Sequence, residues 1–201
     1  MEQENKQIFD FDLKMIADFF RELDRQGPGG VEQTLRALEF VPDRPGMRIA
    51  DIGCGTGGQT VTIARNRDCT ITAVDLLPEL LEEFRARIKK AGLENRVTAI
   101  QGSMDALPFS PGEFDVIWAE GSIYNIGFER GLREWRQYLK PGGIIAVTEC
   151  SWLSGARLTS KFISDYFPDI DSPSGKLRIL EEAGYAPLCL LYTSDACRRL
   201  V

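Results

Sequence analysis

Short apolar runs rich in β-branched residues alternate along this chain with stretches whose apolar residues recur at helical spacing. The runs predict strands over residues 47–52, 70–74, 97–101, 114–119, 143–149 and 188–192. The helical stretches cover residues 11–25, 31–41, 59–66, 78–92, 128–139, 157–167 and 176–183. This alternation indicates an α/β fold, a doubly wound, mostly parallel sheet with helices on both faces. Such sheets bind ligands at the carboxyl ends of their strands, so functional candidates follow each strand.

The chain of 201 residues contains no histidine. Ser-His-Asp or Cys-His catalysis and His-ligated metal centres are therefore excluded, and we expect no metal site. The net charge of −6 argues against a nucleic-acid partner. Five cysteines without a C-x-x-C pair indicate a reducing compartment. Because there is also no 18-residue apolar run, we expect a cytoplasmic protein without a membrane partner.

A glycine-rich loop, residues 51–58 (Asp-Ile-Gly-Cys-Gly-Thr-Gly-Gly), follows the first strand. Its glycines allow a tight turn and close approach of a ligand to the backbone. The loop also satisfies G-x-G-x-x-G, so a nicotinamide-dependent oxidoreductase is an alternative. The next strand leads to Asp75, whose carboxylate suits the two ribose hydroxyls of an adenosine-type ligand. The other interpretation of Asp75 is a cap for the helix that begins at Pro78.

Asp51 precedes the first glycine, where a carboxylate would repel a pyrophosphate and hold an ammonium group. Two further motifs follow, at residues 102–109 and 139–143. With these motifs, residues 45–150 resemble the class I S-adenosylmethionine-dependent methyltransferases of the ubiquinone/menaquinone-biosynthesis type. The resemblance implies a Rossmann-like fold, S-adenosylmethionine as cofactor, and transfer of its methyl group to a small-molecule acceptor by in-line displacement.

The resemblance also implies roles for individual residues. The glycines pass under the methionine portion, Asp51 lies near its amino group, and Asp75 holds the ribose. Leu76, Ser103 and Met104 flank the adenine. The predicted cofactor-binding residues are Asp51, Gly53, Gly55, Gly57, Asp75, Leu76, Ser103, Met104 and Trp118.

The segment after the fourth strand is expected to face the transferring methyl group. Trp118 and Tyr124 are predicted to turn aromatic faces toward the sulfonium, although Trp118 also fits a simple core position. Glu120 and Tyr124 are the predicted catalytic residues, with Glu120 as the base or the group that orients the substrate. Glu149 is the second candidate base. A solvated or capping carboxylate is the alternative for both glutamates.

We expect a single methyltransferase domain, as a monomer or a homodimer. Its predicted parts are an N-terminal helical cap (1–44), a cofactor-binding core (45–150), C-terminal helices with a last strand (151–192) and an irregular tail (193–201). The connection at residues 25–30 is predicted to be a lid hinge whose Arg25 and Gln26 touch the ligand, or else a plain interhelical turn.

The sheet of the resembled family normally carries seven strands. The tail at 193–201 has no strand pattern, so we expect the seventh strand to be missing, as in a truncated or fused version of a longer enzyme. A non-catalytic S-adenosylmethionine-binding module is therefore a further alternative.

Overall fold

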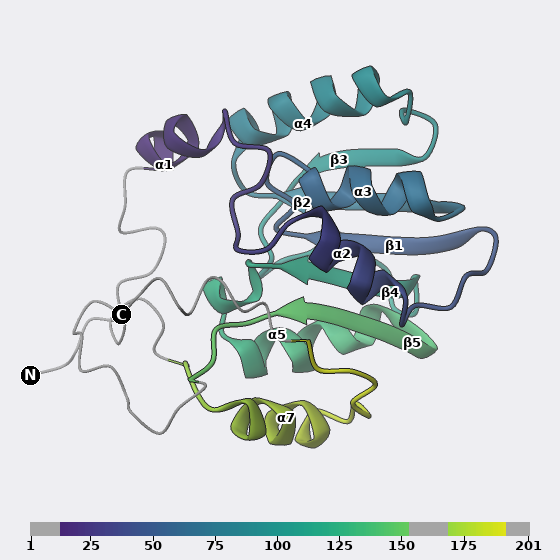
Figure 1. Ribbon diagram of the computed structural model, residues 1–201, viewed down its shortest axis with the longest axis vertical. Coiled ribbons are helices and arrows are strands. Elements are labelled where there is room, and N and C mark those ends of the chain that lie inside the picture. The colour runs from purple at the N-terminus through teal and green to yellow at the C-terminus, as the bar shows by residue number, and fades with distance from the viewer. Residues whose placement is uncertain (1–12, 153–168, 192–201) are drawn as a thin grey trace, which may run out of the picture.

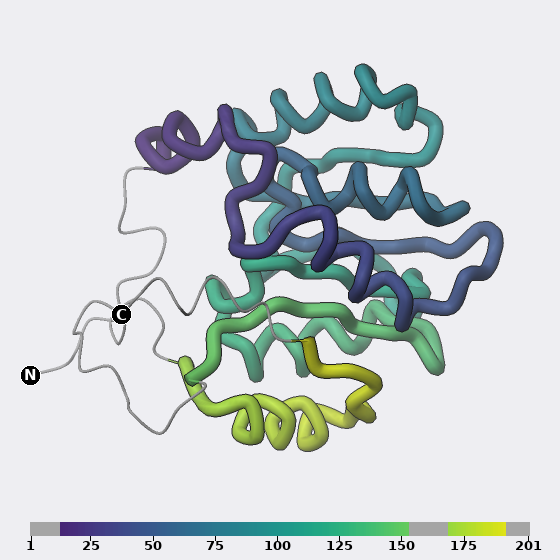
Figure 2. Tube along the Cα trace, viewed as in Figure 1, coloured from purple at the N-terminus to yellow at the C-terminus, as the bar shows by residue number. Residues whose placement is uncertain are grey.

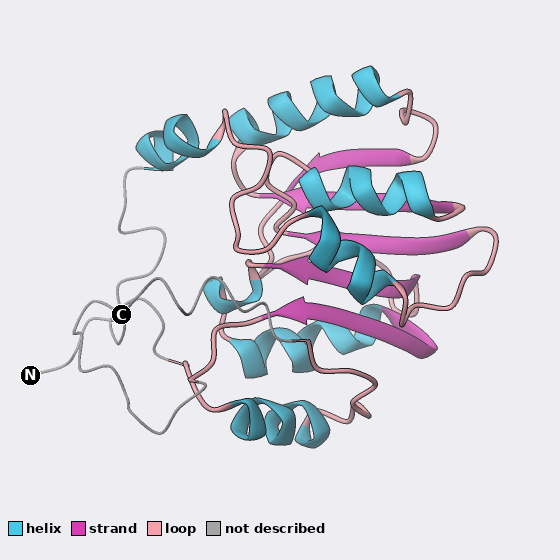
Figure 3. Cartoon of the chain, in the orientation of Figure 1, coloured by secondary structure: helices cyan, strands magenta, loops and turns pink. Residues whose placement is uncertain are grey.

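A parallel sheet of five strands organises the computed structural model, which describes residues 13–152 and 169–191 (Figure 1). The strand order is β3-β2-β1-β4-β5, and all arrows point the same way (Figure 3). The strands are β1 (Met47–Ile52), β2 (Cys69–Asp75), β3 (Val97–Gln101), β4 (Phe114–Glu120) and β5 (Leu139–Thr148).

Helices connect and flank these strands. They are α1 (Leu13–Phe20), α2 (Val31–Leu38), α3 (Gly58–Asn66), α4 (Pro78–Ala91), α5 (Phe128–Trp135) and α7 (Pro173–Glu182), with short 3-10 helices η2 (Ile123–Asn125) and η3 (Arg136–Tyr138). Pro78 occupies the first turn of α4, and Gly92 ends that helix with φ of 66°. Both residues fix the helix bounds locally, as the sequence predicts.

Successive side chains of each strand point to opposite faces of the sheet, where they pack into two separate hydrophobic clusters. Ile49 and Trp118 pack on one face with α2, α3 and α4. Ala50 and Ile117 pack on the other face with α5 and α7. The predicted Rossmann-like, doubly wound architecture is therefore confirmed. Its central strands β1 and β4 lie side by side, and their carboxyl ends lead to helices on opposite faces.

Three predicted elements differ in the structure. The first helix ends at Phe20 rather than residue 25, because the carbonyls of Phe20 and Leu23 accept hydrogen bonds from side chains near the glycine loop. The fifth strand begins at Leu139, inside the predicted helix 128–139. It starts early because Leu139 pairs with Phe114 ahead of a register shift.

The predicted sixth strand is wrong for its described residues, 188–191, which form no strand. Leu188 and Leu190 expose their side chains to solvent instead of pairing with the sheet. The predicted helix 157–167 and the tail 193–201 lie outside the described residues. Within the described part of the chain, no helix combines the length and apolar character needed to cross a bilayer.

Candidate functional site

A cavity of about 140 Å³ lies at the carboxyl ends of β1, β2 and β4. Its walls are the loops after these strands and after β3, together with α1 and the α1–α2 connection. The structure brings eight predicted site residues together on these walls: Gly53, Gly55, Asp75, Leu76, Ser103, Met104, Glu120 and Tyr124. The other three predicted residues, Asp51, Gly57 and Trp118, do not line the cavity.

The glycines of the loop make room for different neighbours. A Cβ atom on Gly55 would collide with the side chain of Gln26, which also lines the cavity. Gly57 has φ of 80°, and a Cβ atom there would collide with the Phe84 ring of α4. Gly57 therefore serves helix packing rather than passing under a ligand, because its free face is filled by Phe84.

Asp75 joins the glycine loop to the start of α4. One carboxylate oxygen accepts a hydrogen bond from Gly55 N at 2.8 Å, and the other accepts one from Leu77 N at 3.0 Å. Burial raises the pKa of this carboxyl, and the backbone N–H groups oppose that shift. Backbone N–H groups of Gly55, Leu76 and Leu77 all act on this carboxylate, and a carboxylate accepts about four hydrogen bonds, so the capping role and a ribose-binding role are compatible.

Asp51 is fully buried behind the cavity wall. It accepts hydrogen bonds from Gln59 Nε2 at 3.1 Å and Thr60 Oγ1 at 2.5 Å, both from the first turns of α3. Burial raises the pKa of Asp51 to about 7, although these hydrogen bonds oppose the shift. Gln59 does line the cavity. Asp51 therefore fixes the orientation of Gln59 on the cavity wall.

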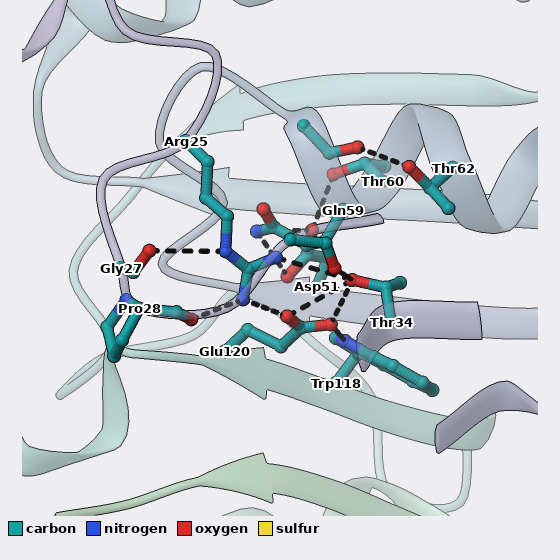
Figure 4. A network of polar contacts seen from close by, with 12 residues as sticks. Arg25, Gly27, Pro28, Thr34, Asp51, Gln59, Thr60, Thr62, Trp118 and Glu120 are labelled. Atoms are coloured by element: carbon teal, nitrogen blue, oxygen red, sulfur yellow. Dashed lines mark hydrogen bonds and ion pairs between the residues drawn. The ribbon is translucent and has the colours of Figure 1, made fainter. Parts of the chain in front are cut away.

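Glu120 is the centre of a buried polar network (Figure 4). Its carboxylate forms an ion pair with Arg25 and accepts hydrogen bonds from Thr34 Oγ1 at 2.9 Å and Trp118 Nε1 at 2.7 Å. The Glu120 side chain is only 7% exposed. Its oxygens are engaged by three donors, which suits a positioning role better than proton abstraction.

Trp118 does not lie at the cavity, where the sequence predicts a contact with the cofactor. Its ring is buried in the cluster that β4 shares with α2, α3 and α4. Side chains of β4 alternate between the two faces of the sheet, and position 118 points to a helical layer. This is the core position that the sequence left open as an alternative.

Tyr124 and Glu149 are the remaining candidates for chemistry. Tyr124, on η2, lines the cavity and is 37% exposed, and desolvation raises the pKa of its phenol. Glu149 follows β5, and its Oε1 lies 3.5 Å from Lys176 Nζ of α7. Its Oε2 is buried and has no hydrogen-bond partner among the described residues, and Glu149 does not line the cavity. Burial raises the pKa of Glu149, and Lys176 opposes the shift.

Sequence reasoning missed Gln59 and Ser122, which both line the cavity. Ser122 Oγ donates to Ile52 O at 2.6 Å, and a Cβ atom on Gly53 would collide with the Ser122 side chain. The available signals were positional, since Gln59 opens the helix after the glycine loop and Ser122 follows β4. Among the described residues, no cluster of three acidic or cysteine side chains is arranged to hold a metal ion.

Comparison with known proteins supports the assignment suggested by this geometry. A family model described as "Methyltransferase domain" matches residues 49–143. Methyltransferase GfsG of Streptomyces halstedii is 30% identical over 128 residues, 63% of this chain and 46% of that protein. The ubiquinone/menaquinone biosynthesis C-methyltransferase UbiE of Shewanella frigidimarina is 31% identical over 118 residues, 57% of this chain and 47% of that protein.

The cyclase SpnF has a similar solved structure, with a TM-score of 0.69 and 26% sequence identity. The match covers 82% of this chain and 62% of that chain. This chain spans about half the length of the two curated relatives. The matched residues carry the glycine loop and the acidic end of β2, and the comparisons support a class I S-adenosylmethionine-dependent methyltransferase domain over residues 49–143.

Proposed function

We propose that this chain transfers a methyl group from S-adenosylmethionine to a small-molecule acceptor. The observation that carries the proposal is the charge of the cavity wall. Among the described residues the wall includes Asp75, Asp105 and Glu120 but no lysine or arginine. Glu120 pairs with Arg25 and Asp105 pairs with Arg130, so Asp75 is the wall carboxylate for which no ion pair is seen among the described residues. Such a wall attracts the sulfonium and ammonium groups of S-adenosylmethionine and repels the pyrophosphate of a nicotinamide dinucleotide.

The geometry supports a specific orientation of the cofactor. Asp75 would accept hydrogen bonds from the ribose, and the backbone of Gly53 and Gly55 would hold the methionine portion. Ser103, Met104 and Leu76, on the loops after β3 and β2, would contact the adenine. Gln59, which Asp51 orients, would face the amino group, because the Asp51 carboxylate itself is enclosed.

S-Adenosylmethionine supplies an electrophilic methyl group when bound, so the protein has to align the acceptor and exclude water. Tyr124 contributes an aromatic wall beside that position. Glu120 is engaged by Arg25, Thr34 and Trp118, and Glu149 does not line the cavity, so we propose an acceptor that needs no carboxylate base from the described residues.

The wider assignment follows from the same charge argument. A net charge of −6 and an acidic cavity favour a small-molecule acceptor over a nucleic acid. We propose a cytoplasmic monomer or homodimer. The similarity to a cyclase shows that one fold hosts different reactions, so methyl transfer itself has to be measured.

Two measurements test the proposal. In calorimetric titrations we expect S-adenosylmethionine and S-adenosylhomocysteine to bind and NAD to give no heat. With methyl-labelled S-adenosylmethionine and fractionated metabolites of the source cell, we expect label in a small molecule. Binding of NAD alone would overturn the cofactor assignment. Binding of S-adenosylmethionine without label transfer in any fraction would favour the non-catalytic binding module.

A further inference from the structure

The connection between α1 and α2 crosses the carboxyl edge of the sheet (Figure 2). We call residues 23–30 the strap. On one side Gln26 Oε1 accepts a hydrogen bond from Thr56 N at 3.1 Å, and Gln26 Nε2 donates to Thr56 Oγ1 at 2.9 Å. On the other side a Cβ atom on Gly27 would lie 3.3 Å from the Cα atom of Gly121. The strap thus contacts the loops after both β1 and β4.

The strap forms part of the wall of the candidate cofactor cavity through Gln26 and Gly27. The cavity measures about 140 Å³ and is partly open to solvent. Pockets for small-molecule ligands typically measure roughly 300–1,000 Å³. The cavity is smaller than this range, so a ligand the size of S-adenosylmethionine needs more room than the closed wall leaves. The other loops of this wall follow strands of the sheet and are anchored by them. The strap instead joins two short helices, α1 and α2, so we expect it to be the part that moves.

Arg25 and Glu120 join the strap to the sheet. The Arg25 guanidinium pairs with Glu120 and also donates to Gly27 O at 3.2 Å and Pro28 O at 3.0 Å, so it fixes the turn of the strap as well. The two side chains are 13% and 7% exposed, and hydrogen bonds between charged groups are strong when shielded from water. In contrast, the Arg87–Asp24 pair at the outer end is exposed on the aspartate side, and such pairs contribute little.

We propose that Arg25 and Glu120 are positioning residues that hold the strap closed over the cofactor cavity, and that breaking their contact limits the release of the adenosyl ligand. The inference rests on the proposed function. In this role Glu120 acts through Arg25 and does not take a proton from the acceptor. Its contacts with Thr34 and Trp118 fix the carboxylate in the direction of the guanidinium.

The test measures dissociation of S-adenosylhomocysteine by stopped-flow tryptophan fluorescence. Arg25→Met keeps an unbranched side chain but removes the guanidinium and its charge, and Glu120→Gln keeps the shape of its partner. We expect each variant to release the ligand about ten- to hundredfold faster, the size of effect known for hydrogen bonds to charged groups. The double variant should release it no faster than the faster single variant, because both changes break one contact.

Arg133→Met is the matched control, since Arg133 is an exposed arginine of α5 paired with Glu129. Its release rate should equal that of the wild type. A second measurement on the wild type covers the case of a variant that does not fold. Trypsin cleavage after Arg25 should slow when S-adenosylhomocysteine is added.

The outcomes separate the two proposals. Failure of the wild type to bind S-adenosylhomocysteine refutes the proposed function and, with it, the role of the strap. Binding with an unchanged release rate in Arg25→Met, or with unchanged trypsin cleavage of the strap, refutes the strap mechanism alone. Additive effects in the double variant would show that Arg25 and Glu120 act independently and would also refute it.

Discussion

Asp75 combines two tasks in one carboxylate at the edge of the cavity. It accepts hydrogen bonds from Gly55 N and Leu77 N, and the carboxylate keeps acceptor capacity for a ribose hydroxyl. For Asp75→Asn we expect a loss of about 1–3 kcal/mol in the binding free energy of S-adenosylhomocysteine, because a charged acceptor becomes neutral and partly a donor. Calorimetry measures this change.

Asp115→Asn is the control for Asp75→Asn. Asp115 pairs with Lys140 and does not line the cavity, so the variant should bind with the affinity of the wild type. If Asp75→Asn also kept the wild-type affinity, Asp75 would be only a cap for the glycine loop and α4.

Asp51 makes the stability of the chain depend on pH. Burial raises the pKa of this carboxyl from its ordinary 3.8 to about 7, so between these values the folded chain keeps a proton that the unfolded chain has lost. The free energy of unfolding therefore falls as the pH rises from about 4 to about 7. Asp51→Asn removes the titrating group. We expect the free energy of unfolding of the variant, minus that of the wild type, to be higher at pH 7.5 than at pH 5.

Urea unfolding at both pH values measures this difference. Asp75 and Glu149 also have raised pKa values, but they remain in both proteins and cancel in the comparison. A constant difference between wild type and Asp51→Asn across the range would show that Asp51 ionises at its ordinary pH when folded.

At the level of elements, Gly57 couples the glycine loop to α4. Its φ of 80° suits glycine, and a Cβ atom would collide with Phe84, which is fully buried. We expect Gly57→Ala to lower the free energy of unfolding by about 2–4 kcal/mol, from left-handed strain and overpacking together. Denaturant titration provides the measurement.

Gly92→Ala is the matched control at the end of the same helix. Gly92 has φ of 66°, but a Cβ atom there would meet nothing within 4 Å. Its substitution should cost only the backbone strain, about 1–2 kcal/mol. Equal losses in Gly57→Ala and Gly92→Ala would mean that α4 moves away without cost and that the loop and the helix are not tightly coupled.

The elements show where sequence reasoning succeeds. The bounds of β1 and β3 and both ends of α4 follow from local signals, namely apolar runs, Pro78 and Gly92. The end of α1 and the start of β5 depend on partners remote in sequence, so local periodicity misplaces them. In the site, local signals succeed for Asp75, because its position on the cavity wall follows from its place at the end of a predicted strand.

The environment of Glu120 was not predictable in that way. Its main partner, Arg25, is 95 residues away and comes from the α1–α2 connection. Trp118 also required the structure, because the face of β4 that it occupies is decided by packing against the helices. Sequence patterns therefore locate the cavity, whereas contacts between distant segments decide which of its carboxylates are engaged.

At the scale of the whole molecule, we propose that the N-terminal cap and the sheet unfold together as a single domain. The strap and α2 contact the glycine loop and Glu120, so loss of the cap would open the cavity at the central strands. Trp118 and Trp135 lie one in each of the two hydrophobic clusters, so tryptophan fluorescence senses the unfolding of both. Thermal unfolding followed by tryptophan fluorescence and by far-UV circular dichroism should then give one common midpoint.

S-Adenosylhomocysteine should raise that common midpoint, because the cavity that binds it exists only in the folded chain. At a free ligand concentration 100 times the Kd the stabilisation is about 2.7 kcal/mol. For a domain of this size that corresponds to a rise in Tm of roughly 5–11 °C. NAD at the same concentration should leave the Tm unchanged. Two separate midpoints, of which the ligand shifts only one, would show that the cap and the sheet unfold independently and would refute the single domain.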